Sequence, residues 1–327
     1  MFSRITQLTR HLSSPTSNFP QTAAPTIAKS TTSALSAMSF PLPKFYENKN
    51  KKIQTAACLI IGDEVLGGKT VDTNSAYFAR WCFNLGIQLK RIEVIADDEE
   101  EIIEGVRRMS DRYDLVVTSG GIGPTHDDIT YQSIAKAFNL KLKLHEEAFE
   151  RMKKLTRPHP MAPSFDWDTP SPALKARKRM VELPYDETVP EKDQSVFVAD
   201  DSWVPVATVN GNVYVLPGVP RLFEKLLEGL TPVVKPRLAG PGAHRIIIST
   251  PLPESVIAHY LGELALRVMP HGVKVGSYPR WGKKNNTVTL VGNDPAYLES
   301  LVPEVERNVQ GKRVQREDEE DEPKTGS

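Results

Sequence analysis

The sequence predicts an α/β fold, a three-layer sandwich with a mostly parallel sheet between two helical layers, followed by a small second domain. Apolar, β-branched runs alternate with amphipathic stretches at the spacing of strand–helix–strand crossover units. Two glycine-containing polar loops follow predicted strands, and ligands of such sheets lie where the strands end. After Pro236 the order becomes strand, helix, two strands and helix, which is typical of a small α+β split βαβ domain.

Composition excludes several classes of protein. The chain has 327 residues, with 41 basic and 41 acidic side chains, so no global field favours nucleic acid or an acidic lipid surface. No apolar run approaches the roughly 20 residues that span a bilayer. Two cysteines, Cys58 and Cys82, are too few for a disulfide framework and are expected in the core as thiols. We therefore expect neither a nucleic-acid partner nor a membrane.

The first 46 residues differ from the rest, because no acidic residue occurs before Glu47. Apolar residues recur there at helical spacing, with arginines between them: Phe2, Ile5, Leu8, Leu12, Arg4 and Arg10. This pattern predicts a mitochondrial transit segment over residues 1–46 and a matrix location. A start at Met38 would leave a cytosolic form. The alternative is a disordered extension without a targeting role.

The first folded domain is predicted over residues 47–235. Its expected strands are 53–61, 87–95, 114–118, 204–209 and 213–216. Its expected helices are 72–85, 99–108, 129–138 and one that ends near 230. Asp72 or Thr73, the pair Asp97-Asp98, and Asp127 or Asp128 are the expected N-caps of the first three, because short carboxylate and hydroxyl side chains accept from the first helical amides. Asn210-Gly211 predicts a hairpin turn.

Residues 157–195 are rich in proline and charge, and they predict a surface excursion with one short helix over 174–180. The basic side chains of that helix are expected to face solvent rather than to bind a phosphate. They are Lys175, Arg177, Lys178 and Arg179. The second domain is predicted over 240–314, with strands 244–250, 273–278 and 287–291 and helices 254–268 and 294–309. Residues 315–327 predict an acidic, disordered tail.

The loop from Ser119 to Asp128 is the strongest candidate for chemistry. Gly120, Gly121 and Gly123 allow a tight turn, and the helix that follows favours an anion at its N-terminus. Two adjacent aspartates would repel a bare phosphate unless a hard cation lay between the aspartates and the phosphate. The loop therefore predicts a site for a phosphate and a divalent metal. An ordinary glycine-rich turn between strand and helix is the alternative.

Three blocks in order, residues 61–74, 119–128 and 216–220, resemble the molybdopterin-binding (MoaB/Mog-like) domain. The resemblance is to the branch shared by CinA-like proteins and the N-terminal part of eukaryotic FAD synthase. It implies a MoaB/Mog-like sheet, homo-oligomers and a small nucleotide or pterin ligand. It also implies metal-dependent hydrolysis of a dinucleotide pyrophosphate, FAD to FMN and AMP or ADP-ribose to AMP and ribose phosphate. A non-catalytic module that binds a pterin or a nucleotide is the alternative.

The residues suit pyrophosphate cleavage, which needs held phosphates, neutralised charge and an oriented water. Asp63, Asp127 and Asp128 are the candidate ligands of Mg²⁺, Mn²⁺ or Co²⁺. Glu64 and Asp128 are the candidate catalytic residues, with Glu64 orienting or deprotonating water. The amides of residues 120–122 are expected to hold one phosphate. The candidate substrate-binding residues are Gly62, Lys69, Asn74, Ser119, Gly120, Gly121, Gly123, Thr125, Pro217 and Gly218.

Overall fold

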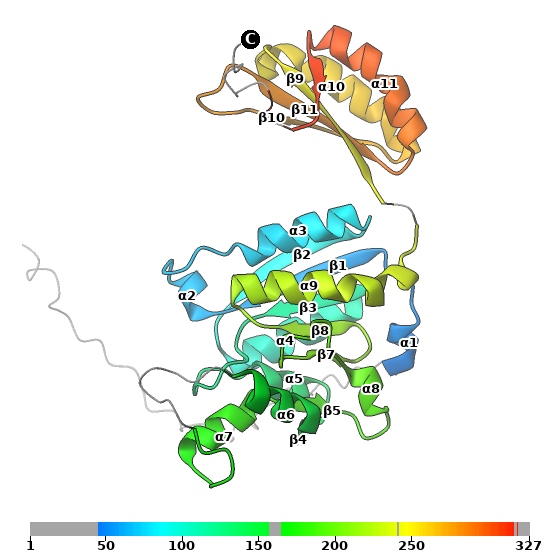
Figure 1. Ribbon diagram of the computed structural model, residues 1–327. Helices are drawn as coiled ribbons and strands as arrows, with labels where there is room; N and C mark the ends of the chain where they lie inside the picture. The colour runs from blue at the N-terminus through cyan, green and yellow to red at the C-terminus, as the bar shows by residue number, and fades with distance from the viewer. Residues whose placement is uncertain (1–44, 157–164, 241, 317–318, 320–327) are drawn as a thin grey trace, which may run out of the picture. The chain divides into compact units, whose positions relative to one another are not determined.

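The structure, a computed structural model, describes residues 45–156, 165–240, 242–316 and 319 (Figure 1). All of them belong to the compact unit Pro41–Ser327. The predicted transit segment lies outside the described residues except for Phe45 and Tyr46, which belong to the folded body. Most of the predicted acidic tail also lies outside them.

A six-stranded sheet forms the centre of the first domain, with the order β2-β1-β3-β8-β7-β6. Its strands are β1 (Thr55–Ile61), β2 (Gln88–Ile95), β3 (Leu115–Ser119), β6 (Ser195–Val196), β7 (Val206–Val209) and β8 (Val213–Leu216). β2, β1, β3 and β8 are mutually parallel, whereas β7 and β6 continue the sheet antiparallel. The prediction of a mostly parallel sheet is confirmed.

The register brings the carboxyl ends of four strands to one edge of this sheet. Ser119, the last residue of β3, pairs with Ile60 on one side and with Leu216 on the other. Ile61 pairs with Ile95, the last residue of β2. The loops that follow these strands are therefore neighbours in space, as the position of ligand sites in open parallel sheets requires.

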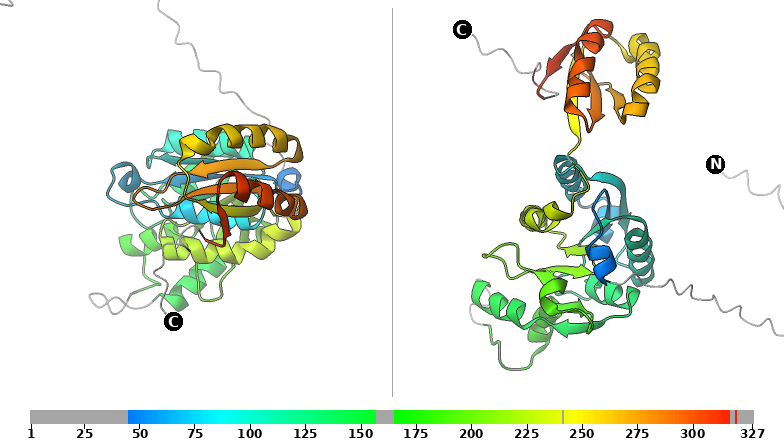
Figure 2. Two further views of the ribbon diagram at one scale, coloured as in Figure 1. Left: turned by 90° about the horizontal axis from the view of Figure 1, so that it is seen from above. Right: turned by 90° about the vertical axis from the view of Figure 1, so that its right-hand side faces the viewer.

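Helices cover both faces of the sheet, which gives three layers (Figure 2). α3 (Asn74–Asn84) and α9 (Pro220–Val234) pack together on one face. α4 (Glu99–Arg112) and α5 (Thr130–Ala137) pack together on the other. β1 and β3 are buried on both sides, so their sequences read as continuous apolar runs. Cys58 and Cys82 are buried thiols in this core, as predicted.

Two of the expected helix caps are present and one is not. The Asp98 carboxylate accepts from the amides of Glu100 and Glu101 at the start of α4. The Asp72 carboxylate accepts from the amide of Ser75 in the first turn of α3. The expected cap of α5 by Asp127 or Asp128 is wrong, because Ile129 precedes that helix and no side chain caps it. The hairpin turn is confirmed, since Asn210 and Gly211 have φ values of 51° and 74°.

The proline-rich excursion contains more structure than one helix. α6 (Glu146–Leu155) leads into it, and α7 (Pro172–Arg179) and α8 (Glu191–Gln194) follow. β4 (Lys141–Leu144) and β5 (Glu182–Tyr185) pair antiparallel in a separate two-stranded sheet. An apolar cluster around Phe149, Met152 and Leu174 packs α7 onto α6. The long loop predicted from proline and charge is thus a packed subregion.

Outside the excursion, three further short helices in the first domain have no counterpart in the predictions. α1 (Phe45–Lys49) lies before β1, and its Asn48 side chain donates to the Asn210 carbonyl at 2.9 Å. α2 (Asp63–Leu66) occupies the start of the loop after β1. The 3-10 helix η1 (Lys235–Arg237) follows α9. All are too short for the periodic patterns that reveal longer helices.

The second domain has an antiparallel four-stranded sheet with the order β10-β11-β9-β12. Its elements are β9 (His244–Thr250), α10 (Glu254–Val268), η2 (Met269–His271), β10 (Lys274–Tyr278), β11 (Asn286–Gly292), α11 (Pro295–Asn308) and β12 (Lys312–Val314). This order completes the predicted split βαβ pattern with a last strand, β12, that we did not predict. Among the described residues, no helix is both long enough and apolar enough to cross a bilayer.

Candidate functional site

Asn74 joins the three sequence blocks at the edge where the parallel strands end. It is the first residue of α3, and its side chain is buried, with 5% of the residue exposed. Its Nδ2 donates to Ser119 Oγ at 2.9 Å and to the carbonyl of Gly218 at 2.9 Å. Ser119 Oγ in turn donates to the Pro217 carbonyl at 3.4 Å. Three predicted substrate-binding segments are thus held together by one amide.

The oxygen of the same side-chain amide, Asn74 Oδ1, has no hydrogen-bond partner among the described residues, although this oxygen is buried. A buried carbonyl oxygen without a hydrogen bond costs free energy of about 1–3 kcal/mol, so such atoms usually meet water or a ligand. Asn74 Oδ1 is therefore suited to accept from a hydroxyl or an amine of a bound molecule.

The glycine-rich loop turns sharply at Gly120. This residue has φ of 112°, and an added Cβ would lie only 2.1 Å from the Ile61 carbonyl oxygen. Its amide donates to the Leu216 carbonyl at 3.2 Å, and its own carbonyl accepts from Thr130 Oγ1 at 2.9 Å. The expectation that the Gly120 amide holds a phosphate is therefore corrected, because the strand-end bond to Leu216 already uses it.

The amides of Gly121 and Ile122 remain as candidate phosphate donors. Neither donates to an acceptor within the described part of the chain. Ile122 is buried, with 9% exposure, and its side chain anchors the loop to the core. We call the sheet edge at which β1, β2, β3 and β8 end, together with the loops that follow them, the rim. Two adjacent amides without acceptors form the kind of backbone concavity that binds anions. The loop thus offers a phosphate two backbone amides rather than the three that we predicted.

Asp128 holds the loop closed with both of its carboxylate oxygens. Oδ1 accepts from the Gly123 amide at 2.6 Å. Oδ2 accepts from the Thr125 amide at 2.8 Å and from Thr125 Oγ1 at 2.5 Å. Two predicted ligand donors, the Gly123 amide and the Thr125 hydroxyl, are therefore engaged inside the loop. The catalytic and metal roles of Asp128 stay predictions, and its visible role is to brace the turn.

A row of carboxylates borders this loop. The amide of Asp63 donates to Asp97 Oδ2 at 3.0 Å, and the amide of Asp97 donates to Asp63 Oδ1 at 3.4 Å. A β-carbon on Gly121 would lie 3.3 Å from Asp97 Oδ1, so this carboxylate reaches the glycine-rich loop. The rim therefore carries an acidic group that the prediction treated only as part of a helix cap.

The charges of the rim perturb its carboxyl groups. Burial raises the pKa of Asp97 and outweighs the lowering by the Asp63 amide, while the carboxylates of Asp63, Glu64 and Asp127 raise it further. Asp127 is exposed, and the polar hydroxyl of nearby Thr125 lowers its pKa, helped by its own backbone amide and by the positive charges of His126 and Arg179. The pKa of Asp97 is thus raised chiefly by burial, and the three neighbouring carboxylates add to this effect.

These carboxylates fit a divalent cation only in part. Among the described residues no group of three or more His, Cys, Asp or Glu side chains is arranged to hold a metal ion. The predicted trio of Asp63, Asp127 and Asp128 is thus not a ready-made site. Mg²⁺ is commonly bound through one or two carboxylates together with substrate phosphates and water, and crowded carboxylates favour a cation between them. The donor set fits a metal that arrives with a phosphate ligand.

The remaining predicted residues lie on the same loops. Gly62 is buried, and its amide continues the sheet by donating to the Ile95 carbonyl at 3.1 Å. Glu64 is exposed in α2, directly after Asp63. Lys69 is exposed in the turn that follows α2 and has no hydrogen-bond partner in the described part of the chain. Both side chains remain available for water and phosphate, so their roles stay predictions.

Sequence reasoning missed two functional candidates, Asp97 and Arg179. Asp97 follows the end of β2 as Asp63 follows the end of β1, so the strand-end rule contained the signal for it. Arg179 ends α7, and its Nη2 donates to the Asp128 carbonyl at 2.8 Å. Its placement on a solvated face is therefore wrong. Nothing in the sequence predicted this contact, because the excursion had no recognisable register with the sheet.

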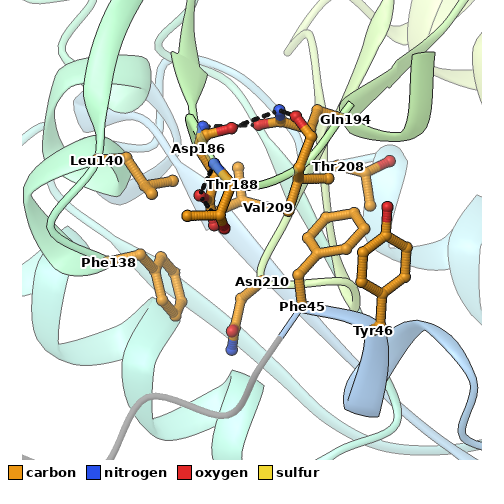
Figure 3. A pocket seen from close by; sticks show the side chains of 11 residues that line it. Phe45, Tyr46, Phe138, Leu140, Asp186, Thr188, Gln194, Thr208, Val209 and Asn210 are labelled. Carbon is orange, nitrogen blue, oxygen red and sulfur yellow. Dashed lines mark hydrogen bonds between the residues drawn. The ribbon is translucent and has the colours of Figure 1, made fainter. Parts of the chain in front are cut away.

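A pocket with a volume of about 360 Å³ lies elsewhere in this domain. Figure 3 shows Phe45, Phe138, Asp186 and Asn210 around it. Asn210 belongs to the turn before β8, so the pocket is at the amino ends of the parallel strands, opposite the rim. None of the predicted site residues lines it.

Comparison with known proteins finds a matching domain family and similar relatives. Residues 57–238 match the domain family described as "Probable molybdopterin binding domain". A "Probable FAD synthase" of Caenorhabditis briggsae is 32% identical over 238 residues, 71% of this chain and 44% of the relative. A Pyrococcus horikoshii protein is 32% identical over 265 residues, 79% of this chain and 96% of the relative.

A solved structure also matches. The CinA protein of unknown function from Thermoplasma acidophilum is 30% identical, with a TM-score of 0.45, over 57% of this chain and 99% of the other. The chain spans less than half the length of the Caenorhabditis relative.

Proposed function

Because the chain belongs to the family of probable molybdopterin binding domains, we propose that its rim binds a dinucleotide and hydrolyses the pyrophosphate bond with a divalent metal. FAD is the first candidate substrate and ADP-ribose the second. The observation that carries the proposal is the convergence of three loops on Asn74, beside two unused amides and four carboxylates. Phosphate, metal and water have donors or acceptors of the right kind there.

Phosphate binding falls to the backbone of the glycine-rich loop. The amides of Gly121 and Ile122 donate to one phosphate, and Lys69 supplies a mobile positive charge from the facing loop. Asn74 Oδ1 accepts from a hydroxyl of the ligand, which satisfies its missing hydrogen bond. Amides fixed by the core need no reorganisation when charge develops on the phosphate, and this lowers the barrier to its transfer.

The carboxylates supply the metal site and the base. One or two carboxylates from the group Asp63, Asp97 and Asp127, together with phosphate oxygens of the substrate, would hold Mg²⁺, Mn²⁺ or Co²⁺, and the metal would neutralise charge on the phosphates. Glu64 accepts the proton of the attacking water. The water oxygen bonds to one phosphorus, and the bond from that phosphorus to the bridging oxygen breaks. FAD and water then give FMN and AMP, with the bridging oxygen kept by the departing phosphate.

One assay tests this proposal. The full chain is incubated with FAD, ADP-ribose or NADH in the presence of Mg²⁺, Mn²⁺ or Co²⁺, and AMP is measured by chromatography. Metal-dependent AMP release from at least one substrate is expected, and Glu64→Gln is expected to lose it. If no metal yields AMP while one of the compounds still binds, the hydrolase proposal is wrong.

A binding module is the second candidate function, and one observation favours it. No group of three metal-ligating side chains is preassembled among the described residues. A module that holds a pterin or nucleotide phosphate needs the amides of Gly121 and Ile122 but no metal. Binding that is equally tight with and without divalent metal, together with no AMP release, is the outcome that favours this function. Homo-oligomers, expected from the resemblance, are proposed for either function.

A further inference from the structure

The end of α7 is attached to the glycine-rich loop through a single guanidinium. Arg179 Nη2 donates to the Asp128 carbonyl at 2.8 Å, and it lies 3.5 Å from the His126 carbonyl and 3.4 Å from Gln132 Oε1. The side chain is half-buried. These contacts join residues about fifty positions apart, so they are tertiary and not part of a local turn.

The two carbonyls held by Arg179 lie on either side of Asp127. When the carbonyls of His126 and Asp128 are both held, the backbone is restricted on either side of the Asp127 Cα. Asp127 itself is exposed, and no hydrogen bond between described side chains holds its carboxylate, since the Thr125 hydroxyl donates to Asp128. Nothing else among the described residues fixes this part of the loop from outside it. Arg179 therefore restrains the backbone around Asp127 from another element, α7.

α7 is in turn anchored firmly enough to act as a support. Ser171 Oγ accepts from the Leu174 amide at 3.1 Å and caps the helix. Leu174 is buried with 4% exposure, in a cluster with Phe149 of α6. The Arg177 guanidinium lies 3.8 Å from the centre of the Phe165 ring and 4.6 Å from that of Trp167. Cation–π contacts and apolar packing thus hold the helix independently of the loop.

The charge of Arg179 also suits this place. Four carboxylates lie at the rim: Asp63, Glu64, Asp97 and Asp127. Arg179 brings a positive charge to the glycine-rich loop from a different helix, α7. An arginine stays charged at all physiological pH values, and its planar fork can bind several acceptors at once. A neutral or flexible side chain in its place would leave the two carbonyls and the nearby carboxylates without this support.

We propose that Arg179 is a positioning residue, which holds residues 126–128 so that Asp127 faces the bound metal and phosphate. This inference rests on the proposed function for the role of Asp127, whereas the loop contact itself does not. It gives the proline-rich excursion a role: the packed region around α7 sets the geometry of the site. Arg179 acts through Asp127 and does not touch the substrate.

The test compares Arg179→Met, Arg179→Lys and the control Lys175→Met in the full chain. Methionine keeps the length of the side chain but donates nothing, whereas lysine keeps the charge and can reach one carbonyl. Lys175 is exposed on the same helix and has no described contact with the loop. Hydrogen exchange of the Gly123 and Thr125 amides reports loop order without any ligand. Free Mn²⁺, measured by electron paramagnetic resonance, reports metal binding in the presence of AMP, which has no pyrophosphate bond to hydrolyse.

Arg179→Met is expected to speed exchange at both amides about tenfold and to raise the Mn²⁺ concentration for half-saturation about tenfold. Arg179→Lys is expected to restore part of both values, and Lys175→Met to change neither. In turnover assays the required metal concentration rises more than kcat falls. Unchanged loop exchange in Arg179→Met overturns the inference. So does faster exchange with an unchanged Mn²⁺ requirement, since the role is then structural only. If wild-type chain releases no AMP, the proposed hydrolysis fails, while the exchange comparison still decides the role of Arg179.

Discussion

The amide nitrogen of Asn74 donates to the hydroxyl oxygen of Ser119 at 2.9 Å, across 45 positions of the chain. The same nitrogen reaches the Gly218 carbonyl, so one side chain holds the loops after β3 and β8 against the start of α3. Ser119 ends β3 and Gly218 lies in the loop that follows β8, and this buried side chain bridges them.

Replacing Asn74 should therefore loosen the rim. Asn74→Ala removes two hydrogen bonds, one to the buried Ser119 hydroxyl and one to the Gly218 carbonyl, so we expect a loss of about 1–3 kcal/mol in the free energy of unfolding. Ser119→Ala removes one of these bonds and the long 3.4 Å bond to the Pro217 carbonyl but keeps the bond from Asn74 to Gly218, so it should cost less. Urea unfolding of both variants gives the values. Equal stability of Asn74→Ala and wild type would show that the amide does not hold these loops.

Asp127 and Asp128 should behave differently, although they are adjacent. Asp128→Ala removes the acceptor of three hydrogen bonds within the loop, and we expect a loss of about 1–3 kcal/mol together with loss of turnover. Asp127→Ala should lose turnover with an unchanged melting temperature, because its side chain is exposed. Calorimetry and the AMP assay on both variants separate the two roles. Matching melting temperatures would remove the bracing role from Asp128.

The raised pKa of Asp97 predicts how stability depends on pH. An acid whose pKa is higher in the folded state binds its proton more tightly there, so the folded protein loses stability as pH rises from the ordinary value of 3.8 through the raised one. Asp97→Asn cannot ionise and should lose this decline. The measurement is the melting temperature between about pH 3.5 and 6.5. Asp111→Asn, an exposed site on α4, is the control. The same decline in Asp97→Asn would contradict the assignment.

The first segment is predicted to direct the protein to mitochondria. A fluorescent protein fused behind residues 1–46 should enter the matrix, because the segment has an acid-free, arginine-spaced amphipathic pattern. Replacing Arg4 and Arg10 with glutamate in the same fusion should abolish import. Diffuse cytosolic fluorescence of the unmodified fusion would mean that this segment has no targeting role.

The sheet and its ligand edge could be predicted because their signals are local. The run from Ala56 to Ile61 is buried on both sides of the sheet, so its apolar sequence identifies a central strand without further information. The strand-end rule then placed Asp63 and Ser119 on one rim, and the Asn74 bridge confirms that these loops meet. The second domain followed from its element order, apart from the short edge strand β12.

The hydrogen bonds of the loop could not be predicted in the same way. Either Asp127 or Asp128 is chemically able to cap α5, and only the loop conformation decides that Asp128 faces back to Gly123 and Thr125. The sequence did not reveal that Asp97 belongs to the site. It precedes Asp98, and a pair of aspartates before a helix is interpreted as the N-cap of that helix. Arg179 reaches the site through a tertiary contact that leaves no periodic pattern in the sequence.

The proposed function requires that the ligand binds at the rim, on the amides of Gly121 and Ile122. Hydrogen exchange of the full chain, with and without ADP-ribose and Mn²⁺, tests it most directly, whether or not turnover occurs. We predict slower exchange at these two amides and in residues 62–74, with no change around Phe138 and Asn210. Protection confined to the pocket near Phe138 and Asn210, with the rim amides unchanged, would contradict the account.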